Sequence, residues 1–343
     1  MRKPRLALLL GEAAGIGPEL LAKVAADSSV RQFADSLLIG DLRVFEQGLT
    51  IANSQVDYVA FTDPDQALKH IGEETVPFLD LQNLNPSDLQ LGQISATSGR
   101  VTAATLTYAL QLAKENKIDG LVYGPLNKEA LYAGGVHFQD EMEFFSDFFS
   151  FTGIAGEMNT VDDLWIARAT SHIGIKQVSQ HLTADSVKQA ILLANQTLKE
   201  VGYSCPRIGV CALNPHGGEG GLFGDEEIRV IAPVVEQAKK EGISISGPYP
   251  ADTIFLKAVE GEMDVVLGMY HDQVQIGFKL IGFKRGVSVS AGLPTVITTP
   301  AHGTAFDIVG KGIADPGPMK RAIAIAAKMV ESRKRLHAGR EAK

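Results

Sequence analysis

LALLLGEAAGIGPELLAKVAA, at residues 6–26, takes the chain from a short apolar run through a glycine-rich loop into a helical pattern. The run Leu6–Leu10 is typical of a buried strand. Pro18 suits the first turn of a helix, because its missing N–H would have no helical partner there in any case. Strand, loop and helix in this order form the repeating unit of a parallel α/β sheet.

The same alternation of short apolar runs and longer helical patterns continues along the chain. Further strands are expected at residues 37–39, 120–123, 164–169, 208–213, 265–269 and 287–290. Helices are expected at residues 18–26, 100–117, 184–201, 225–241 and 318–334. Strands that alternate with helices predict an α/β protein with a mainly parallel sheet.

The length of the chain favours two lobes over one. A chain of 343 residues exceeds the size that a single hydrophobic core usually reaches. We expect the chain to cross between lobes near residues 124 and 280. The first lobe would then hold residues 1–124 and 280–343, and the second lobe residues 125–279.

Composition and charge exclude several classes of partner. The net charge is -8 and no basic stripe lies outside residues 328–343, so we expect no binding of nucleic acid. The apolar runs are too short to cross a bilayer and no secretory signal precedes the first strand, which predicts a cytoplasmic protein without a membrane partner. Cys205 and Cys211 lie too far apart along one predicted strand to form a disulfide, in keeping with a reducing compartment.

The loop at residues 11–19 matches neither of two common phosphate-binding motifs. It is not G-x-G-x-x-G, and it lacks the G-K-[ST] ending of a P-loop. A dinucleotide would therefore bind without the usual fingerprint. A tight turn at the rim of a sheet is the simpler interpretation.

Three histidines each follow a predicted strand: His172, His216 and His271. The carboxyl ends of parallel strands are where open sheets bind their ligands. Three imidazoles can hold a catalytic Zn²⁺ or a similar ion and leave one position for substrate. Their wide spacing forms no local metal motif, so the pattern by itself favours structural histidines.

A second glycine-rich loop runs from His302 to Pro316 near the C-terminus. Gly303, Gly310 and Gly312 permit a ligand to approach the backbone closely. Polar groups along this loop could hold a nucleotide, although the pattern is not specific.

Taken together, these segments resemble the 4-hydroxythreonine-4-phosphate dehydrogenase (PdxA) family over nearly the whole chain. The shared strings are G-x-x-A-G-I-G-P-E at 11–19, G-P-L-N-K at 124–128, N-P-H-x-G-E at 214–219, G-L-F-G-D-E-E at 221–227, P-A-D-T at 250–253, M-Y-H-D-Q at 269–273 and H-G-T-A-x-D-I at 302–308. The last string also resembles a loop of the isocitrate and isopropylmalate dehydrogenases.

The resemblance implies a fold of two α/β/α lobes like that of the isocitrate dehydrogenases, with the active site in the cleft between them. It implies a homodimer with shared active sites, in which a divalent metal (Zn, Mg, Mn or Co) is bound by His172, His216 and His271, one of them from the other subunit. Metal and dimer contacts then belong to the second lobe. The first lobe would bind NAD along His302, Gly303, Thr304, Ala305, Asp307, Ile308 and Asp315.

The implied chemistry is oxidation of a secondary hydroxyl on a small acidic substrate. A metal lowers the pKa of a bound hydroxyl, so a base can take its proton as hydride leaves for nicotinamide. Asp252 and Lys279 match family positions at the reacting end of the substrate, and Lys279 is either a proton carrier or an electrostatic anchor. Oxidation of a 3-hydroxy acid would yield a β-keto acid, which could then lose CO₂. Asn214 is expected to orient a neighbouring ligand.

Four substrate-facing positions depart from the family pattern. A histidine and a threonine of the family are replaced by Glu141 and Met142, an asparagine by Ser288, and an arginine resembling a phosphate ligand by Ile297. Losing that arginine removes a charge-assisted contact worth roughly 1.5–3 kcal/mol, and Glu141 would repel a dianion. We therefore expect a paralogue that acts on an unphosphorylated hydroxy acid or diol acid.

Three alternatives stay open at this point. The chain could be a genuine 4-phosphohydroxythreonine dehydrogenase, a phosphate acyltransferase of the same general fold, or a binding protein without catalysis. An acyltransferase has no use for three histidines at strand ends or for the H-G-T-A loop. Retention of those histidines with Asp252 and Lys279 favours an enzyme over a binding protein.

Overall fold

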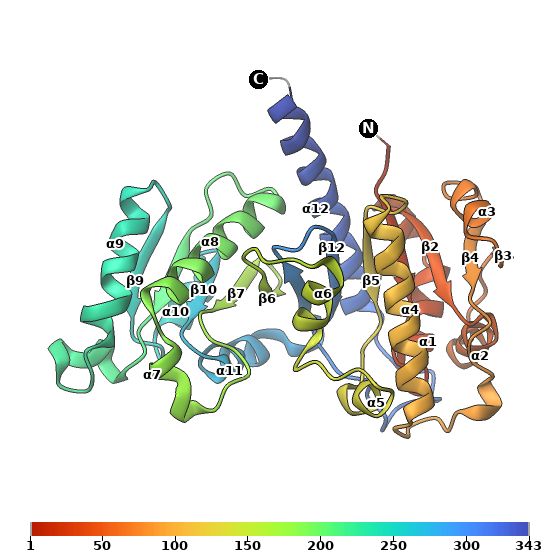
Figure 1. The fold of residues 1–343 in the computed structure, drawn as a ribbon, viewed down its shortest axis with the longest axis horizontal. Coiled ribbons are helices and arrows are strands. Elements are labelled where there is room, and N and C mark those ends of the chain that lie inside the picture. Colours follow the sequence, from red (N-terminus) through yellow and green to blue (C-terminus); the bar gives the residue numbers. More distant parts are fainter. Residues whose placement is uncertain (1, 342–343) are drawn as a thin grey trace. The chain divides into compact units, whose positions relative to one another are not determined.

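The computed structural model describes residues 2–341, so residues 342 and 343 of the basic C-terminal segment lie outside it. The chain forms two compact units (Figure 1). Unit 1 comprises Met1–Thr152 and Leu293–Lys343, and unit 2 comprises Gly153–Gly292. No helix among the described residues is long and apolar enough to span a membrane.

Unit 1 is a parallel sheet with helices on both faces. Its strand order is β3 (Tyr58–Phe61), β4 (Val76–Asp80), β2 (Asp35–Gly40), β1 (Arg5–Leu9), β5 (Gly120–Tyr123), β12 (Val296–Pro300). One face carries α1 (Gly17–Ala26), α2 (Leu42–Ala52) and α12 (Gly317–Glu341). The other face carries α4 (Ala96–Lys114), with α5 (Lys128–Ala133) and α6 (Glu141–Phe149) packed on it. The short α3 (Pro64–Lys69) packs on β3 and β4.

Unit 2 is a mixed sheet, also covered on both faces. Its strand order is β11 (Val287–Ala291), β6 (Gly156–Val161), β7 (Leu164–Arg168), β10 (Val265–Gly268), β8 (Ile208–Cys211), β9 (Ile245–Tyr249). Only β6 runs antiparallel to its neighbours. One face carries α8 (Ala184–Glu200) and α9 (Ala232–Lys240), and the other carries α10 (Ile254–Val259) and α11 (His271–Gly282).

Every strand and helix that the sequence predicted is present. The helix expected at residues 225–241 begins as a π-helical segment, Glu227–Ile231, and continues as α9. The crossings between units fall after Thr152 and Gly292, later than the residues 124 and 280 that the sequence suggested. The reason is that α5 and α6 pack against α4, while β11 pairs with β6.

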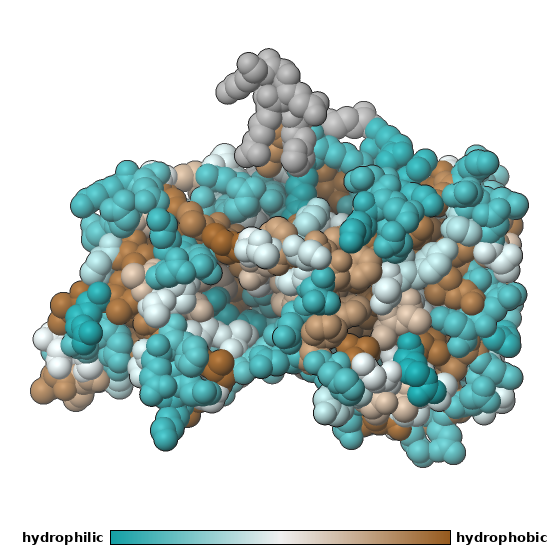
Figure 2. All heavy atoms as spheres, viewed as in Figure 1, coloured by the Kyte–Doolittle hydropathy of each residue, from teal (hydrophilic) through white to brown (hydrophobic). Residues whose placement is uncertain are grey.

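Burial follows the apolar pattern of the central strands. Leu6, Ala7, Leu37 and Leu121 are 0% exposed, because helices cover both faces of the parallel sheet. The molecular face drawn in Figure 2 is mainly polar, with apolar residues in scattered patches. Cys205 and Cys211 are both free thiols, and Cys211 is buried.

Candidate active-site residues

The three histidines lie at one edge of the sheet in unit 2. Strands β7, β10 and β8 are parallel, so their carboxyl ends share an edge. His172 follows β7, His271 opens α11 two residues beyond the end of β10, and His216 lies in the loop after β8. The fold therefore gives all three the placement that their positions after strands predicted.

His172 and His271 are neighbours, with ring centroids 5.8 Å apart. The Nδ1 atom of His271 lies 2.7 Å from an Asp272 carboxylate oxygen, which orients the ring and leaves Nε2 for a ligand. His172 has a left-handed backbone, with φ of 41°. Two adjacent imidazoles are suitable donors for Zn²⁺ and related ions.

His216 does not complete a site within one chain. No three His, Cys, Asp or Glu side chains in residues 2–341 are grouped so that they could hold a metal ion. The His216 ring instead contacts Phe223, at a centroid distance of 6.2 Å. The donor set therefore fits a metal in part, with two imidazoles together and the third apart.

The loop of His216 has an unusual backbone that the sequence permits. Every residue from His216 to Gly220 has a positive φ, and three of the five are glycines. Glu227 anchors the start of the loop, because its carboxylate accepts from the backbone N–H groups of Leu213 at 2.7 Å and Asn214 at 2.8 Å. Burial opposes ionisation of Glu227, but hydrogen bonds from Asn214 outweigh it and hold its pKa below the usual range.

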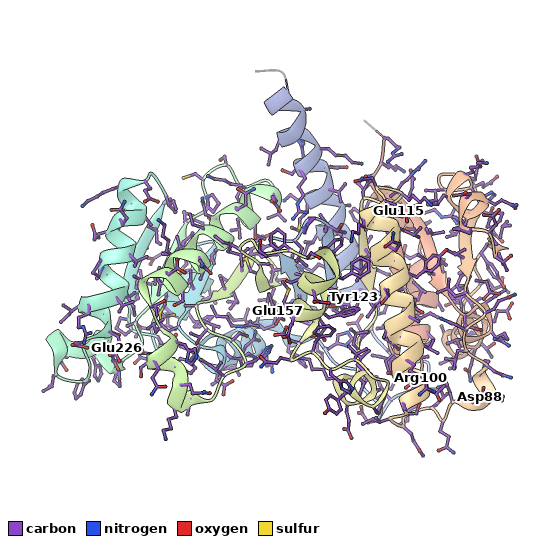
Figure 3. The ribbon with its side chains drawn as sticks, in the orientation of Figure 1. Asp88, Arg100, Glu115, Tyr123, Glu157 and Glu226 are labelled. Carbon is purple, nitrogen blue, oxygen red and sulfur yellow. The ribbon has the colours of Figure 1, made fainter. Side chains whose placement is uncertain are left out.

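The Asn214 side chain fixes the start of this loop through two carboxylates. Its Nδ2 atom donates to Glu226 at 2.6 Å and to Glu227 at 3.0 Å (Figure 3 labels Glu226). A side chain at Gly224 would collide with it, since a Cβ there would lie 2.4 Å from Asn214 Nδ2. The expectation that Asn214 orients a neighbouring ligand stays a prediction.

A polar network under the same edge was not predicted from the sequence. The Ser288 hydroxyl donates to Glu157 at 3.0 Å and accepts from Asn159 Nδ2 at 2.8 Å. Arg168 donates to Glu157 at 2.5 Å and to Ser171 Oγ at 2.9 Å (Figure 3 labels Glu157). Ser288, expected to face substrate, is therefore engaged inside unit 2. The network reaches the residue immediately before His172.

The Arg168–Glu157 pair also lines a cavity. Its lining includes the polar residues Glu157, Arg168 and Ser171 and the apolar residues Met158 and Leu193. The cavity lies between β6, β7 and α8 and encloses about 200 Å³. A small polar ligand would fit there beside the His172 loop.

We predict that Glu157→Ala lowers the free energy of unfolding by about 3 kcal/mol, as for breaking a buried ion pair. The Arg168 side chain is 3% exposed and would lose its carboxylate, whereas the Glu157 side chain keeps 29% exposure, which favours the lower end of the usual range. Urea unfolding at neutral pH measures the effect. A loss below about 1 kcal/mol would mean that the pair is solvated and contributes little.

The same pair predicts a pH dependence. Burial opposes ionisation of Glu157, but the Arg168 charge outweighs it and lowers its pKa below the ordinary 4.5. A lowered folded-state pKa stabilises the protein above 4.5, and that contribution is lost as pH falls through the folded-state value. Glu157→Gln should therefore flatten the acid side of the stability curve below pH 4.5.

The two expected catalytic residues are both exposed. Lys279 lies on α11 at the face shared by His271 and Gln275, since these residues are spaced by four. Its Nζ atom lies 5.6 Å from the centre of the Phe283 ring. Asp252 lies in the turn before α10, and Phe255 of α10 packs against α11 at Gly277.

In unit 1, the two glycine-rich loops lie against each other. The Ile16 N–H donates to the Thr304 carbonyl at 3.1 Å, and a Cβ on Gly15 would lie 2.9 Å from Thr304 Cβ. The first loop is therefore more than a tight turn, since it supports the second. Space beside Gly303 is open, because a Cβ there would meet no atom within 4 Å.

The expected NAD-binding residues differ in their surroundings. Thr304 is buried, Ala305 has a left-handed backbone with φ of 46°, and His302 Nδ1 lies 3.1 Å from the Gly303 carbonyl oxygen. Asp315 accepts from the Gly317 N–H at 2.9 Å, so its carboxylate caps the start of α12. Asp307 is exposed, and Ile308 is half-buried.

The substrate-facing positions of unit 1 include one correction. Ile297 is 0% exposed on β12. Its neighbour Thr298 bonds to Ala322 of α12, so Ile297 faces the opposite side of the sheet and is enclosed there. Ile297 therefore packs in the core and does not form the wall of an open pocket. Glu141 begins α6 and lies 3.5 Å from Lys128 Nζ, while Met142 is half-buried.

Comparison with known proteins places this geometry in a family. The family model described as "Pyridoxal phosphate biosynthetic protein PdxA" matches residues 32–326. A Pseudomonas aeruginosa protein is 45% identical over 95% of this chain and 97% of its own length. The D-threonate 4-phosphate dehydrogenase of Cupriavidus necator is 38% identical over 96% of this chain and 98% of its own length.

Solved structures agree with the sequence comparisons. A 4-hydroxythreonine-4-phosphate dehydrogenase from Burkholderia phymatum has a TM-score of 0.78 at 36% identity, covering 96% of this chain and 99% of that one. A terephthalate 1,2-cis-dihydrodiol dehydrogenase from Burkholderia xenovorans has a TM-score of 0.64 at 27% identity, covering 95% and 98%.

A more distant likeness confirms the expected fold. Isocitrate dehydrogenase from Methylococcus capsulatus has a TM-score of 0.51 at 14% identity, covering 98% of this chain and 89% of that one, which speaks for the fold alone. The closer relatives are dehydrogenases. The two alternatives of an acyltransferase and of a binding protein without catalysis are therefore rejected. The chain is an oxidoreductase that acts on a CH–OH group, and it belongs to the PdxA family.

Proposed function

We propose that this enzyme uses NAD and a divalent metal to oxidise a secondary hydroxyl on a small hydroxy acid or diol acid. The observation that carries the proposal is the pair of adjacent imidazoles, His172 and His271, at the carboxyl edge of the unit 2 sheet. That is the edge at which parallel sheets bind ligands. Membership in a dehydrogenase family supports the same chemistry.

Each group of residues has a distinct task in this proposal. A bound divalent metal supplies Lewis acidity, which lowers the pKa of a coordinated hydroxyl. His172, His216 and His271 hold the ion, and the Asp272 carboxylate keeps the His271 ring oriented. Lys279 and Asp252 contact the reacting end of the substrate, where Lys279 acts either as proton carrier or as electrostatic anchor. Both side chains are exposed, on α11 and in the turn before α10.

NAD is assigned to the loop between β12 and α12. The open space beside Gly303 would let a ligand approach the backbone closely. The residues concerned are His302, Gly303, Thr304, Ala305, Asp307, Ile308 and Asp315, as the resemblance implied. An exposed free thiol at Cys205 suits the reducing cytoplasm in which we expect this enzyme.

Two candidate substrate classes remain, and they differ in whether the substrate carries a phosphate group. The enclosed Ile297 leaves no cation at the position where the family has an arginine, which favours an unphosphorylated substrate. The names of two relatives favour a 4-phosphate, either of D-threonate or of 4-hydroxythreonine. One solved relative, at 27% identity, is named a terephthalate 1,2-cis-dihydrodiol dehydrogenase, and the unphosphorylated compound in that name supports the first candidate.

We propose a homodimer formed through the face of α10 and α11. The α11 residues Ile276 and Leu280 are 62% and 83% exposed, and Leu256 and Val259 of α10 are 63% and 60% exposed. Large apolar side chains gathered on neighbouring helices suit burial against a second copy. Because His271 opens α11, such an interface would lie next to the metal-binding histidines.

Mixed dimers test whether the metal sites are shared. Differently tagged chains carrying His172→Asn, His216→Asn or His271→Asn are combined pairwise, and each heterodimer is purified. If each site takes two histidines from one chain and one from the other, two of the three pairings should regain one intact site and about half the normal activity. The pairing that fails identifies the two histidines from the same chain. Failure of all three pairings would contradict sharing.

The function itself is tested by NADH formation. Purified enzyme is offered hydroxy acids, carboxylated dihydrodiols and 4-phosphorylated sugar acids, each with NAD and with or without added Zn²⁺, Mg²⁺, Mn²⁺ or Co²⁺. We expect NADH to form with at least one substrate and only in the presence of metal. Turnover that survives exhaustive chelation would remove the metal from the proposal.

A further inference from the structure

An ion pair on the buried side of α1 differs from the ordinary surface pairs of this protein. Glu19 and Lys23 lie one helical turn apart, and Lys23 Nζ is 2.7 Å from Glu19 Oε1. Their side chains are only 2% and 18% exposed. Enclosed charges need several hydrogen-bond partners to offset the loss of hydration, so the remaining partners of this pair are informative.

Those partners are backbone groups of the loop after β12. Lys23 Nζ donates to the carbonyl oxygens of Gly312 at 2.9 Å and Ala314 at 2.7 Å. Glu19 Oε1 accepts from the Ala314 N–H at 2.7 Å. The ammonium has three donors, and Glu19 with the two loop carbonyls supplies three acceptors, so Lys23 is matched to this segment of loop. Glu19 Oε2 is buried without a hydrogen-bond partner among the described residues, so the carboxylate depends on the Lys23 and Ala314 contacts of its other oxygen.

The same loop is fastened at its other end. Thr304 accepts the Ile16 N–H at 3.1 Å, and Gly312 lies so close to α2 that a Cβ would be 2.6 Å from the Ile51 carbonyl oxygen. Residues 305–311 are therefore a span held at both ends by the segment from Ile16 to Lys23. They include Asp307 and Ile308, which we assign to NAD.

We propose that Glu19 and Lys23 are positioning residues that hold the NAD-binding loop in its binding conformation before the cofactor arrives. A loop that is already ordered does not lose conformational freedom on binding, so its affinity is higher. The inference rests on the proposed function for the identity of the ligand. The anchoring of the loop rests on the contacts alone.

The test compares Lys23→Met with Lys334→Met. Lys334 also forms an ion pair within unit 1, at 2.8 Å from Asp119, but no contact of that pair involves the loop. For Lys23→Met we expect the Kd for NAD to rise at least about tenfold by calorimetry, with kcat at saturating NAD within about threefold of normal. Lys23→Arg should recover most of the affinity, and Lys334→Met should bind NAD normally.

Trypsin gives a second measurement that needs no cofactor. Lys311 lies inside the span and is exposed, so cleavage after it reports how often the loop opens. Lys23→Met should be cut there at least about fivefold faster than the unchanged enzyme, while Lys334→Met is not. If Lys23→Met fails to fold, Lys23→Gln retains one donor group and is used in its place.

The outcomes separate the two proposals. Unchanged NAD affinity and an unchanged cleavage rate in Lys23→Met would overturn the positioning role. An unchanged enzyme that binds no NAD, but whose Lys23→Met variant is cut faster at Lys311, would overturn the cofactor assignment and leave the anchoring intact. A fall in kcat at saturating NAD with an unchanged KM for NAD would also count against positioning, because it would point to lost catalysis and not to lost affinity.

Discussion

Replacing His216 with asparagine should lower kcat/KM at least ~10³-fold and leave the stability of the protein nearly unchanged. The large kinetic effect is expected because an imidazole would be removed from a three-histidine metal site. The small effect on stability follows from the surroundings of His216, which is exposed in the loop after β8. Asparagine is the better replacement than alanine because it tolerates the φ of 53° at this position.

A matched histidine provides the control. His181 is exposed at the end of α7 (Val178–His181), and its Nδ1 atom bonds to the Gln177 carbonyl at 2.9 Å. His181→Asn should retain normal activity and normal metal content. Activity is compared with bound metal measured by atomic absorption and with urea unfolding. Normal turnover of His216→Asn after chelation and dialysis would exclude His216 from the site.

The order of strands and helices was predictable where apolar runs are uninterrupted. Strands β1, β5 and β10 are such runs, and their burial between helices follows from that composition. Strand β6 was missed because Glu157 and Asn159 interrupt its apolar pattern. Those side chains are acceptable in the strand only because Arg168 and Ser288 lie opposite them, and periodicity carries no information about partners.

Two other missed strands contain glycine or proline residues. Strand β9 contains Gly247 and Pro248, and β4 contains Pro77, each of which argues against a strand when only local signals are used. Helix α11 was missed because only two residues, Met269 and Tyr270, separate the end of β10 from its first residue, His271. In these cases tertiary packing overrides local preference.

The placement of the three histidines at one edge of the unit 2 sheet was predictable, but their surroundings were not. A histidine after a strand can be located from the order of elements alone. Whether a side chain faces a pocket depends on packing, which is why Ile297 was expected at a substrate and proves to be enclosed. Glu19 and Lys23 likewise have the sequence spacing of an ordinary helix pair. Only the fold reveals the loop carbonyls between which Lys23 lies.

The second prediction with a large expected effect concerns the end of the substrate that would carry a phosphate. We expect an unphosphorylated hydroxy acid or carboxylated diol to be preferred over 4-phosphohydroxythreonine by at least ~100-fold in kcat/KM, about 2.7 kcal/mol of transition-state binding. An arginine–phosphate contact is worth roughly 1.5–3 kcal/mol, and Ile297 cannot make it. Lys284 and Lys128 are the candidate replacements for that arginine. The Lys128 Nζ atom lies 3.5 Å from a Glu141 carboxylate oxygen, which offsets its charge.

Substitutions of Lys128 and Glu141 allow this substrate preference to be tested directly. Steady-state kinetics are measured on unphosphorylated substrates, 4-phosphohydroxythreonine and D-threonate 4-phosphate. Glu141→Gln removes the negative charge, so it should improve kcat/KM for the phosphorylated compounds and change the others little. Lys128→Met should then cancel that gain, because the side chain is 56% exposed and is the cation that Glu141 partly neutralises. If the unchanged enzyme already turns over a phosphorylated compound efficiently and Lys128→Met abolishes that turnover alone, Lys128 has replaced the missing arginine and the expected preference is wrong.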